Sequence, residues 1–320
     1  MLKKTSWAVV EGGQAAVCQV AARTLRHRLD TVWTEARAAV IDRRSPERVH
    51  RLRVATRRTL AAFEAFADLV PSRQRLWFHR RLRQLRRAAG DARDLDVLTA
   101  RLAQRPGLTA GTRPAEGARK GTPGGERARS RLIAMLAKQQ DGARLPIRDV
   151  FDRVLAADWT RRVDRLIARI TDEGCPAPFG PYARRRLKPL VLRFFATADR
   201  RLRSAEELHD LRIEGKKLRY ALEIFAGALP PVVRERCEES LARLQETLGD
   251  FTDHAAAADR FRRWSRDASM AADRSVLRML RRQESALADA ARRRFARWWN
   301  PERRRDLRHT FERSLRRHPA

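Results

Sequence analysis

The chain has 320 residues, a length that suits one large or two medium-sized domains. Apolar residues make up 43% of it, which excludes a wholly disordered protein, and 71 Lys and Arg against 39 Asp and Glu give a net charge of +32. Such a charge repels itself unless a polyanion neutralises it, so nucleic acid, an anionic membrane surface and a phosphate polymer are the physical candidates.

The first half of the chain has helical periodicity, and strand patterns are missing. Ser45 is a good N-cap residue and Pro46 suits the first helical position, so a helix is expected to begin there. Residues 105–126 contain three prolines and six glycines, which predicts a flexible loop. The helices predicted in this half cover residues 14–43, 46–68, 71–101 and 127–140, and a connecting stretch runs from Pro146 to about residue 170.

The helical pattern restarts at Pro181. Proline lacks the backbone donor that a helix needs, so Pro189 is expected to bend or break the next helix. Pro230 and Pro231 separate two further helices, and Pro301 precedes a basic tail. The helices predicted in this half cover residues 181–203, 205–228, 231–266 and 273–299.

An internal repeat relates the two halves. A shift of 159 residues aligns residues 47–94 with residues 206–253 without a gap, and 15 of the 48 pairs are identical, polar residues and glycine included. The repeat predicts an all-α fold of two four-helix bundles related by a pseudo-two-fold axis. The predicted parts are a first bundle over residues 12–142, a connector over 143–178, a second bundle over 179–299 and a basic tail over 300–320.

The three cysteines, Cys18, Cys175 and Cys237, are far apart and form no CxxC pair, so neither a disulfide framework nor a zinc finger is indicated. The first residues lack the apolar run of a signal peptide, and no apolar stretch approaches the roughly 20 residues of a membrane helix. We therefore expect a soluble cytoplasmic protein with reduced thiols, without a metal or other cofactor and without a membrane partner.

Two helices at equivalent places in the repeat carry the residues that point to a function. Each has an apolar face, expected to enter the core, and a polar flank on which residues recur about one turn apart. The apolar faces consist of Val49, Leu52, Thr56, Phe63 and Phe66 in the first motif helix (46–68), and of Leu208, Leu211, Gly215, Leu218, Leu222 and Phe225 in the second (205–228). The polar flanks consist of His50, Arg53, Arg57 and Glu64, and of His209, Arg212, Lys216 and Glu223, with Lys217, Arg219 and Tyr220 nearby.

A solvated charged face, in which Glu64 and Glu223 pair with Arg or Lys, would also produce such flanks. The equivalent histidines His50 and His209 favour a shared role instead, because an indifferent surface has no reason to repeat an imidazole. Arginine suits phosphate because its planar fork donates two parallel hydrogen bonds. Cations spaced by about 5–6 Å along a helix could hold successive oxyanions of a phosphate chain.

A second repeated element begins with Gly90 and Gly249 and ends with Asp94 and Asp253. Glycine inside a helix costs roughly 1 kcal/mol relative to alanine, so we expect close helix packing to compensate. Because carboxylates repel phosphate, the aspartates are interpreted as groups that orient nearby arginines.

The motif residues resemble those of the CHAD family, the conserved-histidine α-helical domain. Its pattern H-x-x-R-V/I-x-x-K/R-K/R matches residues 50–58 and 209–217, and the resemblance extends over about residues 12–299. It implies two four-helix bundles with a basic central surface that binds inorganic polyphosphate, and association with polyphosphate granules. We expect no enzymatic activity. The ligands that it implies are His50, Arg53, Arg57, Arg58, His209, Arg212, Lys216 and Lys217, with Arg219, Arg26 and Arg185 as weaker additions.

Two alternatives remain. A nucleic-acid-binding helical protein would suit the charge, and nonspecific nucleic-acid binding is expected because DNA phosphates also release counterions; zinc-finger and RNP-like motifs are missing, however. A metal-dependent phosphohydrolase is the less favoured alternative. The pair His209-Asp210 resembles its HD dyad, but Asp210 corresponds to Arg51 in the repeat, so the dyad is not duplicated.

Overall fold

The computed structural model describes residues 12–103, 123–172 and 177–316. These residues form ten α-helices and two short 3-10 helices, with no strand among them beyond one isolated bridge, so the prediction of an all-α fold is confirmed. The helices are α1 (Val17–Ile41), α2 (Pro46–Ala65), α3 (Ser72–Ala103), α4 (Pro123–Ala156), α5 (Trp159–Asp172), α6 (Phe179–Ala198), α7 (Ala205–Ile224), η1 (Ala226–Ala228), α8 (Pro231–Trp264), η2 (Ala268–Asp273), α9 (Arg274–Trp298) and α10 (Pro301–Arg316).

Two prolines lie inside helices: Pro146, where a connecting stretch was expected to start, and Pro189, which was expected to bend or break its helix. α4 continues through Pro146, and α6 continues through Pro189. Both prolines face solvent, while the buried residues on either side of them continue the apolar face of the helix. The burial of these apolar side chains offsets the loss of one backbone hydrogen bond, which explains why the helices are not interrupted.

Most of the predicted basic tail over residues 300–320 is helical, because residues 301–316 form α10. Leu307 and Phe311 lie one turn apart on α10 and are buried, and the Phe311 ring contacts Phe195 of α6 with a centroid distance of 6.2 Å. Most of the predicted loop over residues 105–126 lies outside the described residues, and its last four residues begin α4.

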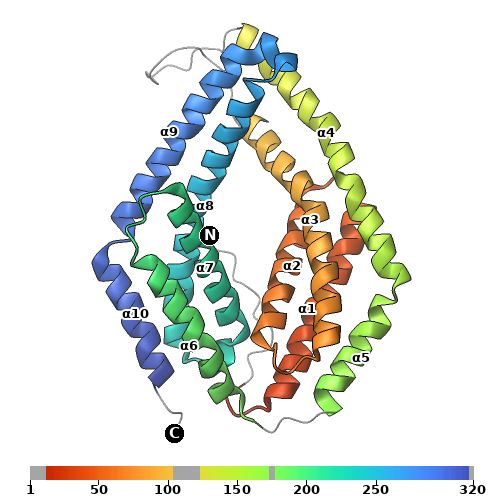
Figure 1. The fold of residues 1–320 in the computed structure, drawn as a ribbon, viewed down its shortest axis with the longest axis vertical. Helices are drawn as coiled ribbons and strands as arrows, with labels where there is room; N and C mark the ends of the chain where they lie inside the picture. Colours follow the sequence, from red (N-terminus) through yellow and green to blue (C-terminus); the bar gives the residue numbers. More distant parts are fainter. Residues whose placement is uncertain (1–11, 104–122, 173–176, 317–320) are drawn as a thin grey trace.

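Helices α1–α5 form one half of the molecule and α6–α10 the other (Figure 1). In each half two long helices pack along one another, α3 with α4 and α8 with α9. Figure 1 shows these pairs as two arms that meet at one end of the molecule. A small apolar cluster fills that meeting point, with Leu98 from α3, Leu136 from α4, Phe261 from α8 and Leu280 from α9.

The main core spans both halves and contains the predicted apolar faces of the two motif helices, all of whose members are buried. α2 and α7 also contact each other. Phe66 and Phe225, which are equivalent in the repeat, meet edge to face with ring centroids 5.9 Å apart. Backbone hydrogen bonds join the starts of α1 and α6, where Phe179 N donates to Ala15 O at 2.9 Å.

Two of the three cysteines are described, Cys18 and Cys237, and both are buried. Cys175 lies outside the described residues. No helix in the described part of the chain is long and apolar enough to cross a bilayer.

Candidate anion-binding site

Four cations from the two motif helices face each other where α2 and α7 meet. Arg53 and Arg57 come from α2, and Arg212 and Lys216 come from α7; we call these four the central basic cluster. Burial, together with the neighbouring charges of Arg212 and Arg57, lowers the pKa of Lys216 to about 8. Burial also lowers the pKa of Arg212, and Arg57 adds to that shift. The two halves of the repeat therefore bring like charges together.

None of the four side chains forms an ion pair with any carboxylate of the described residues. Like charges at this range raise the free energy of the ligand-free protein, since each disfavours the charged form of its neighbour. An anion placed among them would remove that repulsion.

The repeated glycines make room for two of these arginines. A Cβ added at Gly90 on α3 would lie 3.3 Å from Nη1 of Arg53, and one added at Gly249 on α8 would lie 3.7 Å from Nη2 of Arg212. The predicted close approach is therefore between a helix and a guanidinium group, and not between two helix backbones. Arg53 also donates from Nη1 to the Arg86 carbonyl at 3.5 Å, which ties its side chain to α3.

The aspartates of the same elements face arginines across the two halves. Burial raises the pKa of Asp94, and the charges of Arg53 and Arg260 oppose that shift. Asp253 lies near Arg212, whose charged form it favours, and 4.0 Å from Nη2 of Arg101. These aspartates lie where they can orient the arginines of the cluster.

Arg58, a predicted ligand, is held in a buried ion pair. Its Nε lies 3.0 Å from Oε2 of Glu223, a carboxylate whose side chain is only 5% exposed. Arg219 of α7 and Arg28 of α1 both lie 3.7 Å from the same carboxylate. The equivalent Glu64 is 63% exposed, so the two repeated glutamates have different environments.

Other predicted ligands are also paired. Lys217 lies 2.5 Å from Glu214 on its own helix, and Arg185 lies 3.4 Å from Asp68. Arg26 pairs with Asp164 of α5. Ion pairing therefore holds for five of the predicted ligands but not for the central basic cluster; the five are Arg58, Lys217, Arg219, Arg26 and Arg185.

The two predicted histidines are placed differently. His209 is exposed on α7, whereas His50 is partly buried on α2. Burial lowers the pKa of His50, and Arg93 lowers it further, so this imidazole is neutral at pH 7 in the ligand-free protein.

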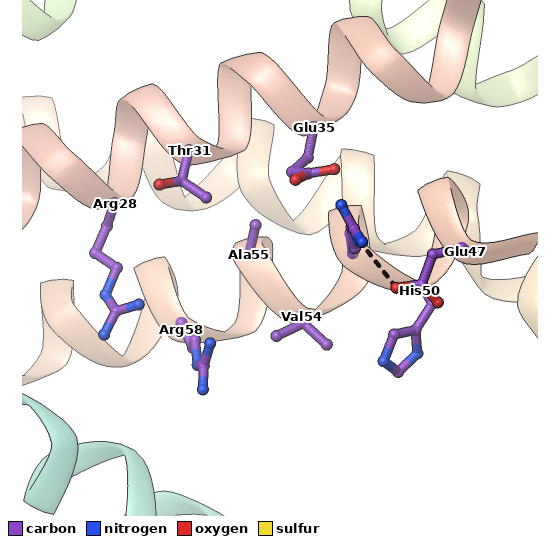
Figure 2. Close-up of a pocket in the computed structure, with 9 residues that line it drawn as sticks. Arg28, Thr31, Glu35, Glu47, His50, Val54, Ala55 and Arg58 are labelled. Carbon is purple, nitrogen blue, oxygen red and sulfur yellow. Dashed lines mark hydrogen bonds and ion pairs between the residues drawn. The ribbon is translucent and has the colours of Figure 1, made fainter. Parts of the chain in front are cut away.

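His50 also lines a pocket of about 240 Å³ between α1 and α2. Figure 2 shows that Arg28, Thr31 and Glu35 come from α1, while Glu47, Ala55 and Arg58 come from α2. Glu47 accepts a hydrogen bond from Nε of Arg51 at 2.9 Å. Two carboxylates make this pocket a poor phosphate site, so the central basic cluster is the better candidate.

Residues 23–262 match the family described as CHAD domain. The chain belongs to the CHAD domain family. Helices α9 and α10 follow the matched residues.

Two solved structures resemble this CHAD domain in fold. The crystal structure of the CHAD domain from the plant Ricinus communis aligns with a TM-score of 0.68 at 21% identity, over 95% of this chain and 94% of that one. PptA from Streptomyces chartreusis aligns with a TM-score of 0.57 at 16% identity, over 95% of this chain and 100% of that one. Identities this low show the shared fold alone. No curated protein matches the chain.

The CHAD fold also brings two arginines to the site that sequence reasoning missed. The charge of Arg93 on α3 lowers the pKa values of His50 and Arg53, and the charge of Arg260 on α8 lowers the pKa of Asp94. Arg260 corresponds to Arg101 at the 159-residue shift, just beyond the aligned segment, so a longer alignment would have found it. Arg93 corresponds to Thr252, so the repeat gives no signal for it.

Proposed function

We propose that this CHAD domain binds inorganic polyphosphate through the central basic cluster. The observation that supports this is a contrast between neighbouring cations. Arg53, Arg57, Arg212 and Lys216 form no ion pair within the described chain, while Arg58 and other cations close by are paired with carboxylates. Unpaired, mutually repelling cations drawn from both halves are what a multiply charged anion would stabilise.

Capture is non-covalent and multidentate. The arginines of the cluster offer planar pairs of donors to successive phosphates, and Lys216 adds a compact charge between them. The aspartates Asp94 and Asp253 lie beside the arginines and hold them in place. Counterion release supplies much of the binding free energy, so affinity falls steeply with salt concentration.

The proposed role is binding and not turnover. Asp210, the second member of the HD-like pair, lies 3.8 Å from Arg200, and its equivalent in the repeat is Arg51, so the other half has no such pair. Within the described ranges, no group of three or more His, Cys, Asp or Glu side chains could hold a metal ion. Incubation of the protein with polyphosphate and Mg²⁺ or Mn²⁺ tests this: we expect no release of phosphate above buffer, and release that His209→Ala abolishes would contradict it.

Nucleic acid is the competing ligand. Binders of single strands stack bases on exposed aromatic rings. Here the aromatic pair at the end of α9 packs inward, since Trp299 is buried with its ring 6.1 Å from Phe194, and Trp298 lies under Arg303 and Arg243. The decisive experiment is a competition at fixed salt. Long-chain polyphosphate is expected to displace duplex DNA at a far lower phosphate concentration, and the reverse order would contradict the proposal.

Polyphosphate binding would direct the protein to polyphosphate granules. A fluorescently tagged chain is expected to colocalise with granules and to become diffuse in cells that cannot synthesise polyphosphate. A distribution that is the same in both kinds of cell would contradict granule association.

A further inference from the structure

A second basic pocket lies at the end of the α8–α9 arm, away from the central basic cluster. It has a volume of about 220 Å³. Its lining consists of Arg262, Ser265 and Arg266 from the end of α8 and of Arg278, Arg281 and Arg282 from α9, and includes no carboxylate. We call it the arm pocket.

Each acidic residue around the arm pocket already has a partner, and only Asp259 pairs with an arginine of the lining. Asp259 pairs with Arg262, through Nε at 3.1 Å, and with Arg263 at 3.4 Å. Asp267 accepts hydrogen bonds from the backbone N of Ser269 at 2.9 Å and from its hydroxyl at 2.7 Å. Asp273 pairs with Arg131 of α4.

Four arginines of the arm pocket form no ion pair with a carboxylate of the described residues, namely Arg266, Arg278, Arg281 and Arg282, although Arg266 lies near enough to Asp259 to lower its pKa. The pocket is therefore strongly positive.

Helix electrostatics alone do not explain this charge. The carbonyl end of α8 favours cations, which accounts for Arg262 and Arg266. The amino end of α9 does not account for Arg278, Arg281 and Arg282, because its preference is for anions and is confined to the first turn. Arg278 and Arg282 are also like charges four residues apart, an arrangement that destabilises a helix. A bound anion would offset that repulsion.

We infer that the arm pocket is a second anion site, which takes the phosphate groups of an oligophosphate. Exposed guanidinium groups from two helices surround a space with room for such a group, and their forks match phosphate oxygens. Neither the family match nor the repeat accounts for it: the repeat segment ends at Asp253, and the matched residues end at Arg262.

The arm pocket and the central basic cluster can share one polymer. Gly249, beneath the Arg212 guanidinium, and Arg262 lie on the same helix, 13 residues or about 20 Å apart at 1.5 Å per residue. A long polyphosphate could contact both, so the second contact becomes intramolecular and raises the avidity. This bivalent capture rests on the proposed function, whereas anion binding in the arm pocket does not.

Calorimetric titration of the full chain with tripolyphosphate, an oligomer too short to reach both sites, tests the inference. The wild type is expected to bind two molecules per chain, and R278E/R282E is expected to bind one. R293E/R297E is the matched control, because these exposed arginines lie on α9 with the same spacing, carry the same charge change and lie outside the arm pocket. It should keep both sites. The neutral variant R278Q/R282Q gives the same test with less disturbance of folding.

Equal stoichiometry in R278E/R282E and R293E/R297E would contradict anion binding in the arm pocket. The variant R57E/K216E tests the proposed function separately. It is expected to lose the tripolyphosphate site in the central basic cluster and to keep the site in the arm pocket. With long-chain polyphosphate, R278E/R282E should bind at least tenfold more weakly than R293E/R297E, because avidity is lost. Equal affinities of these two variants would contradict bivalent capture.

Discussion

Phe66 and Phe225, 159 residues apart and equivalent in the internal repeat, contact each other edge to face with ring centroids 5.9 Å apart. A residue touches its own equivalent only near a two-fold axis. The aspartates agree with this, because Asp94 faces Arg260 and its equivalent Asp253 faces Arg101, the equivalent of Arg260. We infer that an approximate two-fold axis passes between α2 and α7, beside the central basic cluster.

The aromatic contact should be measurable as a coupling between the halves. Phe66→Ala and Phe225→Ala are each expected to destabilise the protein by about 3–5 kcal/mol, because both rings are fully buried. The double variant should lose less than the sum, by about 1 kcal/mol, because the edge-to-face contact is lost only once. Urea unfolding of the four proteins measures this coupling, and strict additivity would contradict it.

Glu223 and Glu64, which are equivalent in the repeat, allow the contribution of the buried ion pairs to stability to be measured. Glu223→Gln is expected to lower the free energy of unfolding by about 3 kcal/mol, because Arg58 and Arg28 lose a buried counter-charge. Glu64→Gln should change it by less than about 0.5 kcal/mol, because the Glu64 side chain is 63% exposed. Similar losses in both variants would contradict a structural role specific to Glu223.

The two glycines should differ in their effect on binding. Gly90→Ala places a Cβ 3.3 Å from Nη1 of Arg53, so the guanidinium must move and polyphosphate affinity should fall several-fold. Gly249→Ala leaves an ordinary contact of 3.7 Å, so affinity should not change. Both variants should be as stable as the wild type or more stable, by up to about 1 kcal/mol, since alanine favours a helix. Equal affinities in titrations of the two variants would show that the position of Arg53 does not matter.

Lys216 makes binding sensitive to pH on the alkaline side. Its pKa of about 8 means that it loses its charge as pH rises through 8, so polyphosphate affinity should fall between pH 7 and 9. Lys216→Arg should remove most of this fall, because arginine stays charged. A decline of the same size in both proteins, in titrations at constant ionic strength, would assign it to another group.

The stability of the ligand-free protein should change in the opposite direction. The pKa of Lys216 is depressed in the folded state, so the unfolded chain binds more protons between pH 8 and the ordinary lysine value of 10.5. The contribution of this residue to stability is therefore unfavourable below pH 8 and improves as pH rises through that range. Chemical unfolding at a series of pH values, with Lys216→Arg as reference, measures it.

Much of the fold could be predicted from periodicity. The apolar faces of both motif helices are buried as predicted, and α2, α7 and α8 begin within a residue or two of their expected starts. The continuity of the helices at Pro146 and Pro189 was not predicted, because the local propensity of proline does not include the apolar surface that the residues on either side bury. The hydrophobic spacing of Leu307 and Phe311 was hidden by the many arginines around them.

The candidate site was only partly predictable. The repeat selected Arg53, Arg57, Arg212 and Lys216, and the structure brings these four together. Sequence could not separate Arg57 from its neighbour Arg58, because their different environments depend on Glu223 of the other half. Arg93 has no basic equivalent in the repeat, so only the packing of α3 beside α2 places it near His50.

The salt dependence of polyphosphate binding tests the central claim most directly. Equilibrium titrations at several salt concentrations would compare the wild type, R57A/K216A and the control R293A/R297A, which removes two positive charges outside the central basic cluster. We predict that R57A/K216A binds more weakly at every concentration, and that the slope of log affinity against log salt becomes shallower by about 1.5 to 2, one phosphate contact per lost cation. The control should keep the slope of the wild type. An unchanged slope and affinity in R57A/K216A would contradict polyphosphate binding at the central basic cluster.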